Sequence, residues 1–312
     1  MDGLEGEEME QNESIKIKIQ QREIPDFRGY VRPIISEFID VLEKNFPEDV
    51  VNHFYQNIRT LKLVKKKRMP SQAVGAFNRK KNEILYKDDA TEELDYTLFH
   101  EFFHLASCHE KKVGFHDYTV NRGWGINEGF TEFLTVKYFG LDEDSVGYLF
   151  EISVVNVLNS ILGEEKMTGL YMNANYLGLS LSLEHYLDRK QSDDFIRKLD
   201  HFTFVTTDLP FLQNLFLMRH YISSLTKDIS SFLAKMYIKK NLDTLQCIPY
   251  QDEAQIRNFY WHYRDIINQN IPMDFLPLEY GVDESFLLSY LEEMGYSLPG
   301  WRESNNKIQR GL

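Results

Sequence analysis

Two histidines and a glutamate stand at HExxH spacing in the segment HEFFH, residues 100–104. On a helix, His100 and His104 lie one turn apart on the same face, where both imidazoles can reach one tetrahedral zinc ion. Glu101 is rotated to a position from which its carboxylate can reach a water on the metal but not readily the metal itself. The segment therefore predicts two metal ligands and a general base. The alternative is a pair of histidines that merely pack within a helix.

A third protein ligand is needed, because catalytic zinc commonly keeps three protein ligands and one open position. Glu128, in GWGINEGFTEFLT, begins a second expected helix whose apolar residues can pack it against the HEFFH helix. Glu132 lies one turn further along the same face and can accept a hydrogen bond from the second ring nitrogen of a ligand histidine. His109 and His116, in the irregular segment between the helices, are alternative ligands. For the two glutamates the alternative is a solvated helix face.

With HEFFH and NEGFTE, the sequence resembles the gluzincin metallopeptidases, in which HExxH on one helix is joined by a glutamate from a second helix, often within NExxxE. The resemblance covers residues 73–138 and implies a thermolysin-like catalytic core with one Zn²⁺ ion. The metzincin pattern HExxHxxGxxH is excluded, because Ser107 and Glu110 replace its glycine and third histidine. The implied residues are the zinc ligands His100, His104 and Glu128, and the base Glu101.

The strand segments VGAFN and EILY, within residues 73–87, look like the edge strand on which gluzincins bind substrate by backbone pairing. Aminopeptidases of the family carry GxMEN there, whereas this chain has Gly-Ala-Phe-Asn at residues 75–78. An endopeptidase is therefore expected rather than an aminopeptidase. The family also uses a downstream Tyr or His to stabilise the oxyanion. The candidates are Tyr171 and Tyr176, with His185 and His220 also eligible.

The spacing of apolar residues along the rest of the chain predicts an α+β fold that is mostly α. An N-terminal portion, residues 16–164, would hold the edge strand and both active-site helices, and residues 165–312 a helical C-terminal portion, with a soft division near GEEKMTG. Residues 1–15 are expected to be a disordered acidic tail, and residues 108–125 an irregular connection. Helices are expected at 30–46, 47–63, 88–107, 126–140, 142–163, 168–190, 192–200, 208–240, 251–268 and 283–294.

Composition and charge limit the classes of partner and the cellular location that we expect for this protein. The formal charge of −13 makes duplex nucleic acid and anionic membranes poor partners. The basic runs at 65–68 and 79–81 are taken as solvated segments, with an acidic-peptide contact as the alternative. Cys108 and Cys247 form no CxxC pair, and the acidic N-terminus lacks a signal-peptide pattern. The expectation is a cytoplasmic protein with no membrane span, or alternatively an exported effector or toxin. Composition does not predict its oligomeric state.

Zinc-dependent hydrolysis of peptide bonds, with a peptide or protein as substrate, is the function that this sequence predicts. One alternative is a metallopeptidase-like zinc protein that has lost activity and serves as a binding module through its helical second half. The other is a metal-free helical interaction protein in which HEFFH only packs. Metal content distinguishes the metal-free interaction protein from the peptidase and from the inactive zinc protein. Hydrolysis of peptides then distinguishes the peptidase from the inactive zinc protein.

Overall fold

The computed structural model describes residues 27, 29–69, 73–87, 94–140, 147–207 and 215–241, and only the backbone for 215–219. The expected tail at 1–15, the helices expected at 251–268 and 283–294, and Cys247 lie outside this part of the chain. Helices predominate among the described residues, with small sheets confined to the N-terminal half, which confirms the mostly α, α+β fold class. No helix in this part combines the length and apolar character that a membrane crossing requires.

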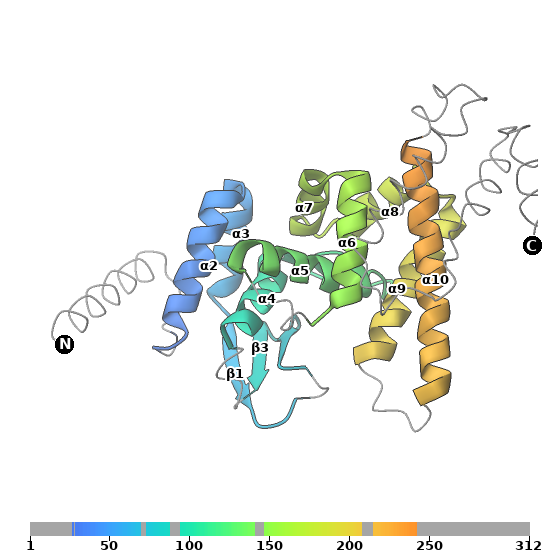
Figure 1. Ribbon diagram of the computed structural model, residues 1–312. Helices are drawn as coiled ribbons and strands as arrows, with labels where there is room; N and C mark the ends of the chain where they lie inside the picture. Colours follow the sequence, from blue (N-terminus) through green and yellow to red (C-terminus); the bar gives the residue numbers. More distant parts are fainter. Residues whose placement is uncertain are drawn as a thin grey trace, which may run out of the picture.

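The helices between residues 149 and 207 follow one another with short connections, whereas strands separate the helices that end at Ile58 and Ala106 from the next ones (Figure 1). Most lie where the three-and-four spacing of apolar residues predicts them. The expected helix at 168–190 is instead two helices, because the chain turns at Ala174, which has a φ of 46°, and Asn175 then caps the second helix by accepting from the Gly178 amide at 2.8 Å. The helices are α2 (Arg32–Asn45), α3 (Glu48–Ile58), α4 (Leu94–Ala106), α5 (Trp124–Phe139), α6 (Leu149–Leu162), α7 (Glu164–Met172), α8 (Tyr176–Glu184), α9 (Arg189–Thr207) and α10 (Leu215–Lys240).

A three-stranded sheet has the order β1-β3-β2, with β1 (Lys62–Lys66) parallel to β3 (Glu83–Lys87) and β2 (Gly75–Asn78) antiparallel to β3. The strands β2 and β3 confirm the pair expected within residues 73–87. The helix predicted over 47–63 ends instead at Ile58, and its last two residues, Lys62 and Leu63, begin β1, which continues into the basic run at 65–68. The Asn82 side chain donates to the carbonyl of Asn57 at 2.7 Å and to Thr60 at 2.8 Å. This contact ends α3 and turns the chain into pairing with β3.

Residues 108–117 form a second small sheet, where an irregular connection was expected. Its strands are β4 (Cys108–His109), β5 (Lys112–Val113) and β6 (His116–Asp117), paired antiparallel in that order. Strands of two residues are too short to show an alternating pattern, which is why the sequence did not reveal them. Their tight turns use positive φ angles at Glu110 (47°) and Gly114 (52°).

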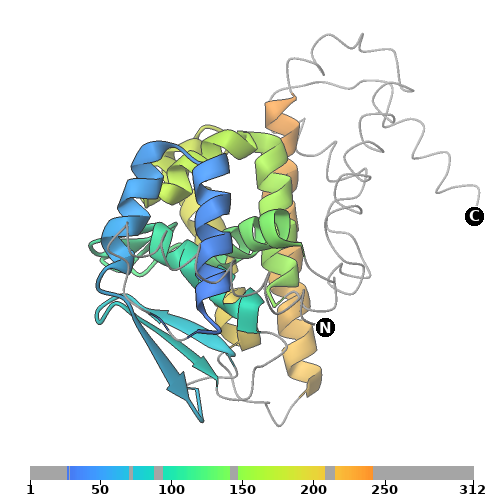
Figure 2. The same ribbon diagram turned by 90° about the vertical axis from the view of Figure 1, so that its left-hand side faces the viewer.

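Helix α5 lies at the centre of the molecule and packs against α4, α6 and α9 (Figure 1). On the other side of α4, Phe102 and Phe103 pack ring to ring against Phe38 of α2, and Phe102 also packs against Phe54 of α3. The two phenylalanines of HEFFH therefore anchor α4 in the core and leave its other face to the histidines. Figure 2 shows the sheet of β1, β2 and β3 projecting from one end of this helical body. The proposed division near residue 165 stays a prediction.

Candidate metal centre

Three buried side chains meet between α4 and α5. The Nε2 atoms of His100 and His104 are 3.1 Å apart, and each lies 3.3 Å from the Glu128 Oε2 atom. A tetrahedral zinc ion with bonds of about 2.0–2.1 Å sets its ligand atoms roughly 3.3–3.4 Å apart. The triangle therefore matches three corners of such a tetrahedron within a few tenths of an ångström. His100, His104 and Glu128 form a group able to hold one metal ion.

His100 is oriented by Glu132, as the sequence spacing predicted. Its Nδ1 donates to Glu132 Oε2 at 2.8 Å, and Glu132 Oε1 accepts from the Gly147 amide at 2.7 Å. Burial alone would lower the pKa of His100, but the hydrogen bonds with Glu128 and Glu132 raise it to about 10. Without a metal ion, His100 therefore carries a proton on Nε2 as well as on Nδ1. A divalent cation would displace the Nε2 proton, while Nδ1–H stays bonded to Glu132 and orients the Nε2 lone pair toward the metal.

His104 is held from behind by Thr131. The Thr131 hydroxyl donates to the Asn127 carbonyl at 2.8 Å, so its lone pairs are left to accept from the Tyr171 hydroxyl at 2.6 Å and from His104 Nδ1 at 3.3 Å. The side-chain Nδ2 of Asn127, which can only donate, is equally close to Nδ1, at 3.3 Å, so Nδ1 has both a donor and an acceptor within reach. Donation from Nδ1–H to Thr131 is the tautomer that leaves the Nε2 lone pair free for a metal.

Glu128 is oriented by Trp124, which stands one turn earlier on α5. The indole Nε1 donates to Glu128 Oε1 at 3.0 Å. The other oxygen, Oε2, is the one that faces the two histidines. Burial would raise the pKa of Glu128, but the charges and hydrogen bonds of His104 and His100 hold it well below its usual range. The carboxylate is therefore ionised and presents a single oxygen to the site.

Glu101 lies beside the triangle and takes no part in it. Its side chain is buried, and the Phe77 amide of β2 hydrogen-bonds to it. The Oε2 atom has no hydrogen-bond partner among the residues that the structure describes. Burial raises the pKa of Glu101, although the charges of His104 and His100 lower it. A buried carboxylate with one unpaired oxygen next to a metal-binding triangle has the properties of a proton acceptor.

Two further polar side chains lie near the triangle. Tyr148 stacks on the His100 ring with centroids 5.8 Å apart, and its pKa is raised well above the usual value by burial and by the Glu128 and Glu101 charges. Tyr148 belongs to no recognisable motif, so only the fold identifies it. His116, which the sequence offered as an alternative ligand, lies outside the His-His-Glu group. It has a buried Nε2 atom without a partner in the described part of the chain, and its ring stacks on Tyr118 at 3.9 Å.

The other candidate ligands and oxyanion residues lie elsewhere. His109 stacks on His53 at 3.8 Å and donates from Nε2 to the Met172 carbonyl at 2.9 Å. Tyr171 is fully buried behind His104, where it supports Thr131, a placement that does not favour contact with substrate. Tyr176 begins α8, close to Gly123 and Asp200 rather than to the histidines. His185 stacks edge-on against its neighbour Tyr186.

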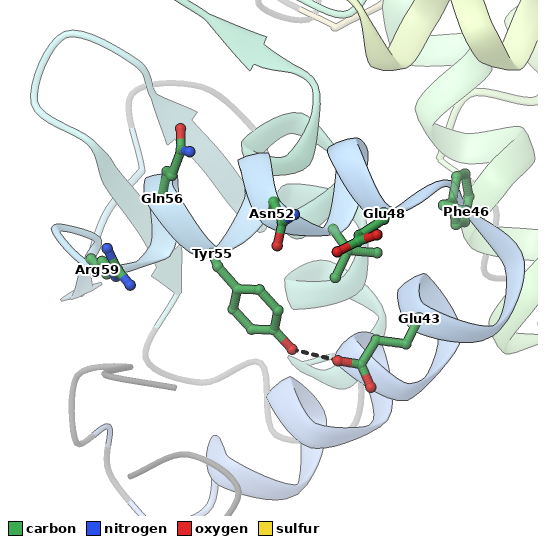
Figure 3. A pocket seen from close by; sticks show the side chains of 8 residues that line it. Glu43, Phe46, Glu48, Asn52, Tyr55, Gln56 and Arg59 are labelled. Atoms are coloured by element: carbon green, nitrogen blue, oxygen red, sulfur yellow. Dashed lines mark hydrogen bonds between the residues drawn. The ribbon is translucent and has the colours of Figure 1, made fainter. Parts of the chain in front are cut away.

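Two of the hollows on the surface bear on the site. One, of about 560 Å³, is lined by residues next to the metal centre, including Trp124 and His116, and by Asp200 and His201 of α9. The other, of about 680 Å³, lies on α2 and α3, where the Tyr55 hydroxyl donates to the Glu43 carboxylate at 2.8 Å (Figure 3). No side chain of the triangle lines either hollow. The first is connected to the triangle through Trp124, whose indole donates to Glu128.

No protein-family model matches this chain, and no curated protein or solved structure matches it either. What the fold and the site define is a helix-rich α+β protein with a buried His-His-Glu group, on two helices, of the kind that holds a metal in HExxH sites. The gluzincin resemblance thus rests on HEFFH, NEGFTE and this geometry alone.

Proposed function

We propose that this protein is a zinc-dependent peptidase of gluzincin type that acts within peptide chains. The observation that carries the proposal is the triangle of His100 Nε2, His104 Nε2 and Glu128 Oε2, with the unpaired carboxylate oxygen of Glu101 beside it. Two imidazoles and one carboxylate suit zinc, and two histidines at HExxH spacing on a helix with a third ligand are the arrangement that catalytic zinc sites use.

The zinc ion would supply a Lewis acid that lowers the pKa of water from about 16 toward roughly 7 and polarises a carbonyl. Glu101 accepts a proton from the attacking water as the new C–O bond forms and then returns it to the leaving amine, so that the C–N bond can break. Burial raises the pKa of Glu101, which makes this carboxylate a stronger base than an exposed one. Tyr148 and His116 are polar groups near the triangle that can donate to the substrate's oxygen.

Strand β2 offers a surface for an extended peptide. The Lys87 amide donates to the Val74 carbonyl at 2.9 Å, and because hydrogen-bonded pairs alternate in an antiparallel ladder, Gly75 and Phe77 point their backbone groups to the outer side of β2. No strand pairs with that side within the described residues. The Phe77 amide already bonds to Glu101, so a substrate would pair with the other outward backbone groups, those of Gly75 and the Phe77 carbonyl, next to Glu101. The strand carries no acid that would hold a free amine, which favours endopeptidase action.

The experiment is hydrolysis of a peptide library by purified protein, with zinc content measured in parallel. We expect one zinc per chain, activity lost with a chelator and restored by zinc. Glu101→Gln should keep the zinc and lower the rate by roughly 10²–10⁴-fold, because it removes the proton acceptor but not a ligand. Glu165→Gln, on the surface of α7, is the matched control and should leave the rate unchanged. An unaltered rate in Glu101→Gln would refute this role.

Stoichiometric zinc without hydrolysis of any peptide would favour the alternative of a zinc-bearing binding module. Absence of zinc from protein that was purified and reconstituted with the metal would instead favour a metal-free interaction protein. The cytoplasmic location and the peptide or protein partner stay predictions.

A further inference from the structure

Helix α5 begins without a cap of its own. The residue before it, Gly123, has a φ of 86° and no side chain to accept from the first amides of the helix. Such amides need acceptors, because they have no partner within the helix. Asp200 of α9 supplies them: its Oδ2 accepts from the Gly123 amide at 3.0 Å and its Oδ1 from the Gly125 amide at 2.8 Å. One carboxylate, far along the chain, therefore bridges the start of the metal-binding helix.

Helices α5 and α9 pack closely at Gly125. A Cβ on Gly125 would lie 2.7 Å from the carbonyl oxygen of Leu199, so only glycine lets the α9 backbone come this near. The approach half-buries the carboxylate, and this burial raises the pKa of Asp200 to about 6, although the Gly125 and Gly123 amides lower it. The negative charge also lies at the positive end of the α5 dipole, where it stabilises the first turn.

Trp124 stands between the two glycines that Asp200 holds. Its indole donates to Glu128 Oε1, and Glu128 presents its other oxygen to the histidines. A chain of contacts thus runs from the Asp200 carboxylate through the first turn of α5 to Trp124 and then to the third corner of the triangle. A shift of this turn by a few tenths of an ångström would move the indole and release the carboxylate of Glu128.

We propose that Asp200 is a positioning residue for the metal centre, which holds Glu128 in its metal-binding orientation through the first turn of α5 and Trp124. The inference rests on the proposed zinc site and extends it to the C-terminal helices. It makes zinc affinity depend on the packing of α9 against α5. The surface hollow that Asp200 and Trp124 line together gives a bound molecule access to this contact.

The test measures zinc affinity by competition with a chromophoric chelator. Asp200→Asn keeps the shape but replaces one acceptor with an N–H₂ group that faces a backbone N–H, so we expect the zinc dissociation constant to rise about tenfold. Asp194→Asn is the matched control, because Asp194 lies on the same helix and pairs only with Arg197 and Lys198 among the described residues. It should change the constant less than twofold. Circular dichroism shows whether each variant is folded.

A double-mutant cycle separates positioning from a general loss of stability. Trp124→Phe removes the donor to Glu128 and should weaken zinc binding by itself. If Asp200 acts through Trp124, the double variant Asp200→Asn/Trp124→Phe should bind little more weakly than Trp124→Phe alone, because the contact is already broken. The absorption spectrum of the cobalt-substituted protein should change in the same direction in both single variants.

The inference is overturned if folded Asp200→Asn binds zinc as the wild type does, or if the effects of the two substitutions multiply in full. Should Asp200→Asn fail to fold, Asp200→Glu, which keeps the charge but displaces it by one methylene, must still raise the dissociation constant. Failure of the wild type to bind zinc at all would refute the proposed function instead, so the two failures are distinguishable.

Discussion

At the scale of single residues, each ligand side chain has a partner on α5 that fixes its orientation. Glu132 holds His100, Thr131 holds His104 and Trp124 holds Glu128. Positions 124, 128, 131 and 132 fall on one face of a helix, because three or four residues complete a turn. One face of α5 therefore supplies the ligand Glu128 and the hydrogen-bond partners of all three ligands. These residues lie within nine consecutive positions, 124–132.

The support of His100 can be tested at Glu132. Glu132→Gln keeps an acceptor for Nδ1–H but removes the negative charge that makes the imidazole a stronger ligand. We expect zinc to bind roughly 10-fold to 100-fold more weakly, as is usual when such a partner is lost. Chelator competition measures the change, with Glu165→Gln as the control that neutralises an exposed acid. Unaltered affinity in folded Glu132→Gln would mean that the contact does not support the ligand.

Glu151 gives the metal-free protein a predictable pH dependence. The side chain is 3% exposed and accepts from the Thr203 hydroxyl at 2.6 Å, and burial raises its pKa to about 7. Because the folded state holds this proton more tightly than the unfolded state, its stabilising contribution is complete below about pH 4.5 and is lost as the pH rises through about 7. Stability should therefore decline over that range.

Glu151→Gln removes this titration. At about 1.4 kcal/mol per pKa unit, the variant should unfold with a free energy roughly 3 kcal/mol higher than the wild type at pH 8, and with little difference near pH 4.5. Urea unfolding of chelator-treated protein at several pH values gives the comparison. If the free energy of unfolding changes with pH in the same way in both proteins, ionisation of Glu151 does not destabilise the folded state.

At the scale of elements, two glycines let neighbouring helices approach α5. Gly125 faces the Leu199 carbonyl of α9, and a Cβ on Gly129 would lie 2.6 Å from backbone atoms of Glu151 in α6. Both contacts are with backbone, which cannot move aside as a flexible side chain can. The position of α5 between α6 and α9 therefore depends on the lack of a side chain at these two residues.

Gly129→Ala should force α6 away from α5 and lower the free energy of unfolding by about 1–3 kcal/mol, the usual cost of overpacking a core. Gly169→Ala, in α7, is the matched control, since a Cβ there meets nothing within 4 Å. It should stabilise the protein by roughly 0.5–1 kcal/mol through helix propensity and chain entropy. Denaturant titration of both metal-free variants tests the contrast. A Gly129→Ala variant that is as stable as the wild type, or as stable as Gly169→Ala, would contradict the prediction.

At the scale of the whole molecule, a metal ion would join two central helices that packing already holds together. Ligands from α4 and α5 converge only in the folded chain, so metal binding is linked to folding. With free zinc at a hundred times its dissociation constant, the folded state gains about 2.7 kcal/mol. For a chain of this size, with an unfolding entropy of about 2.1 cal/mol/K per residue, that free energy corresponds to a rise in Tm of roughly 4 °C.

Scanning calorimetry or dye-monitored melting with and without zinc measures this rise. His104→Ala should abolish it, because a corner of the triangle is lost. His109→Ala should keep it, because His109 stacks on His53 away from the triangle, even though the baseline Tm falls with the lost contact. A zinc-dependent shift that survives in His104→Ala but disappears in His109→Ala would place the metal elsewhere.

The sequence by itself determined which ligand side chains share a helix face. The spacing of HEFFH puts two imidazoles on one face of a helix, and NEGFTE puts Glu128 and Glu132 one turn apart, because helical geometry depends only on neighbouring residues. The three-and-four apolar spacing likewise predicted most helices and the mostly α fold. It did not predict β1 or the strands at 108–117, since their formation depends on pairing with distant or very short segments.

Only the tertiary structure decided how the two helices meet. The 3.3 Å separation between Glu128 and the histidines follows from the packing of α5 against α4, α6 and α9, which no short motif encodes. The same holds for the Asp200 carboxylate at the start of α5 and for Tyr148 against His100. These contacts join residues that are far apart in the chain. Their geometry is set by the shape of the whole core, whereas the types of the ligands are set by local spacing.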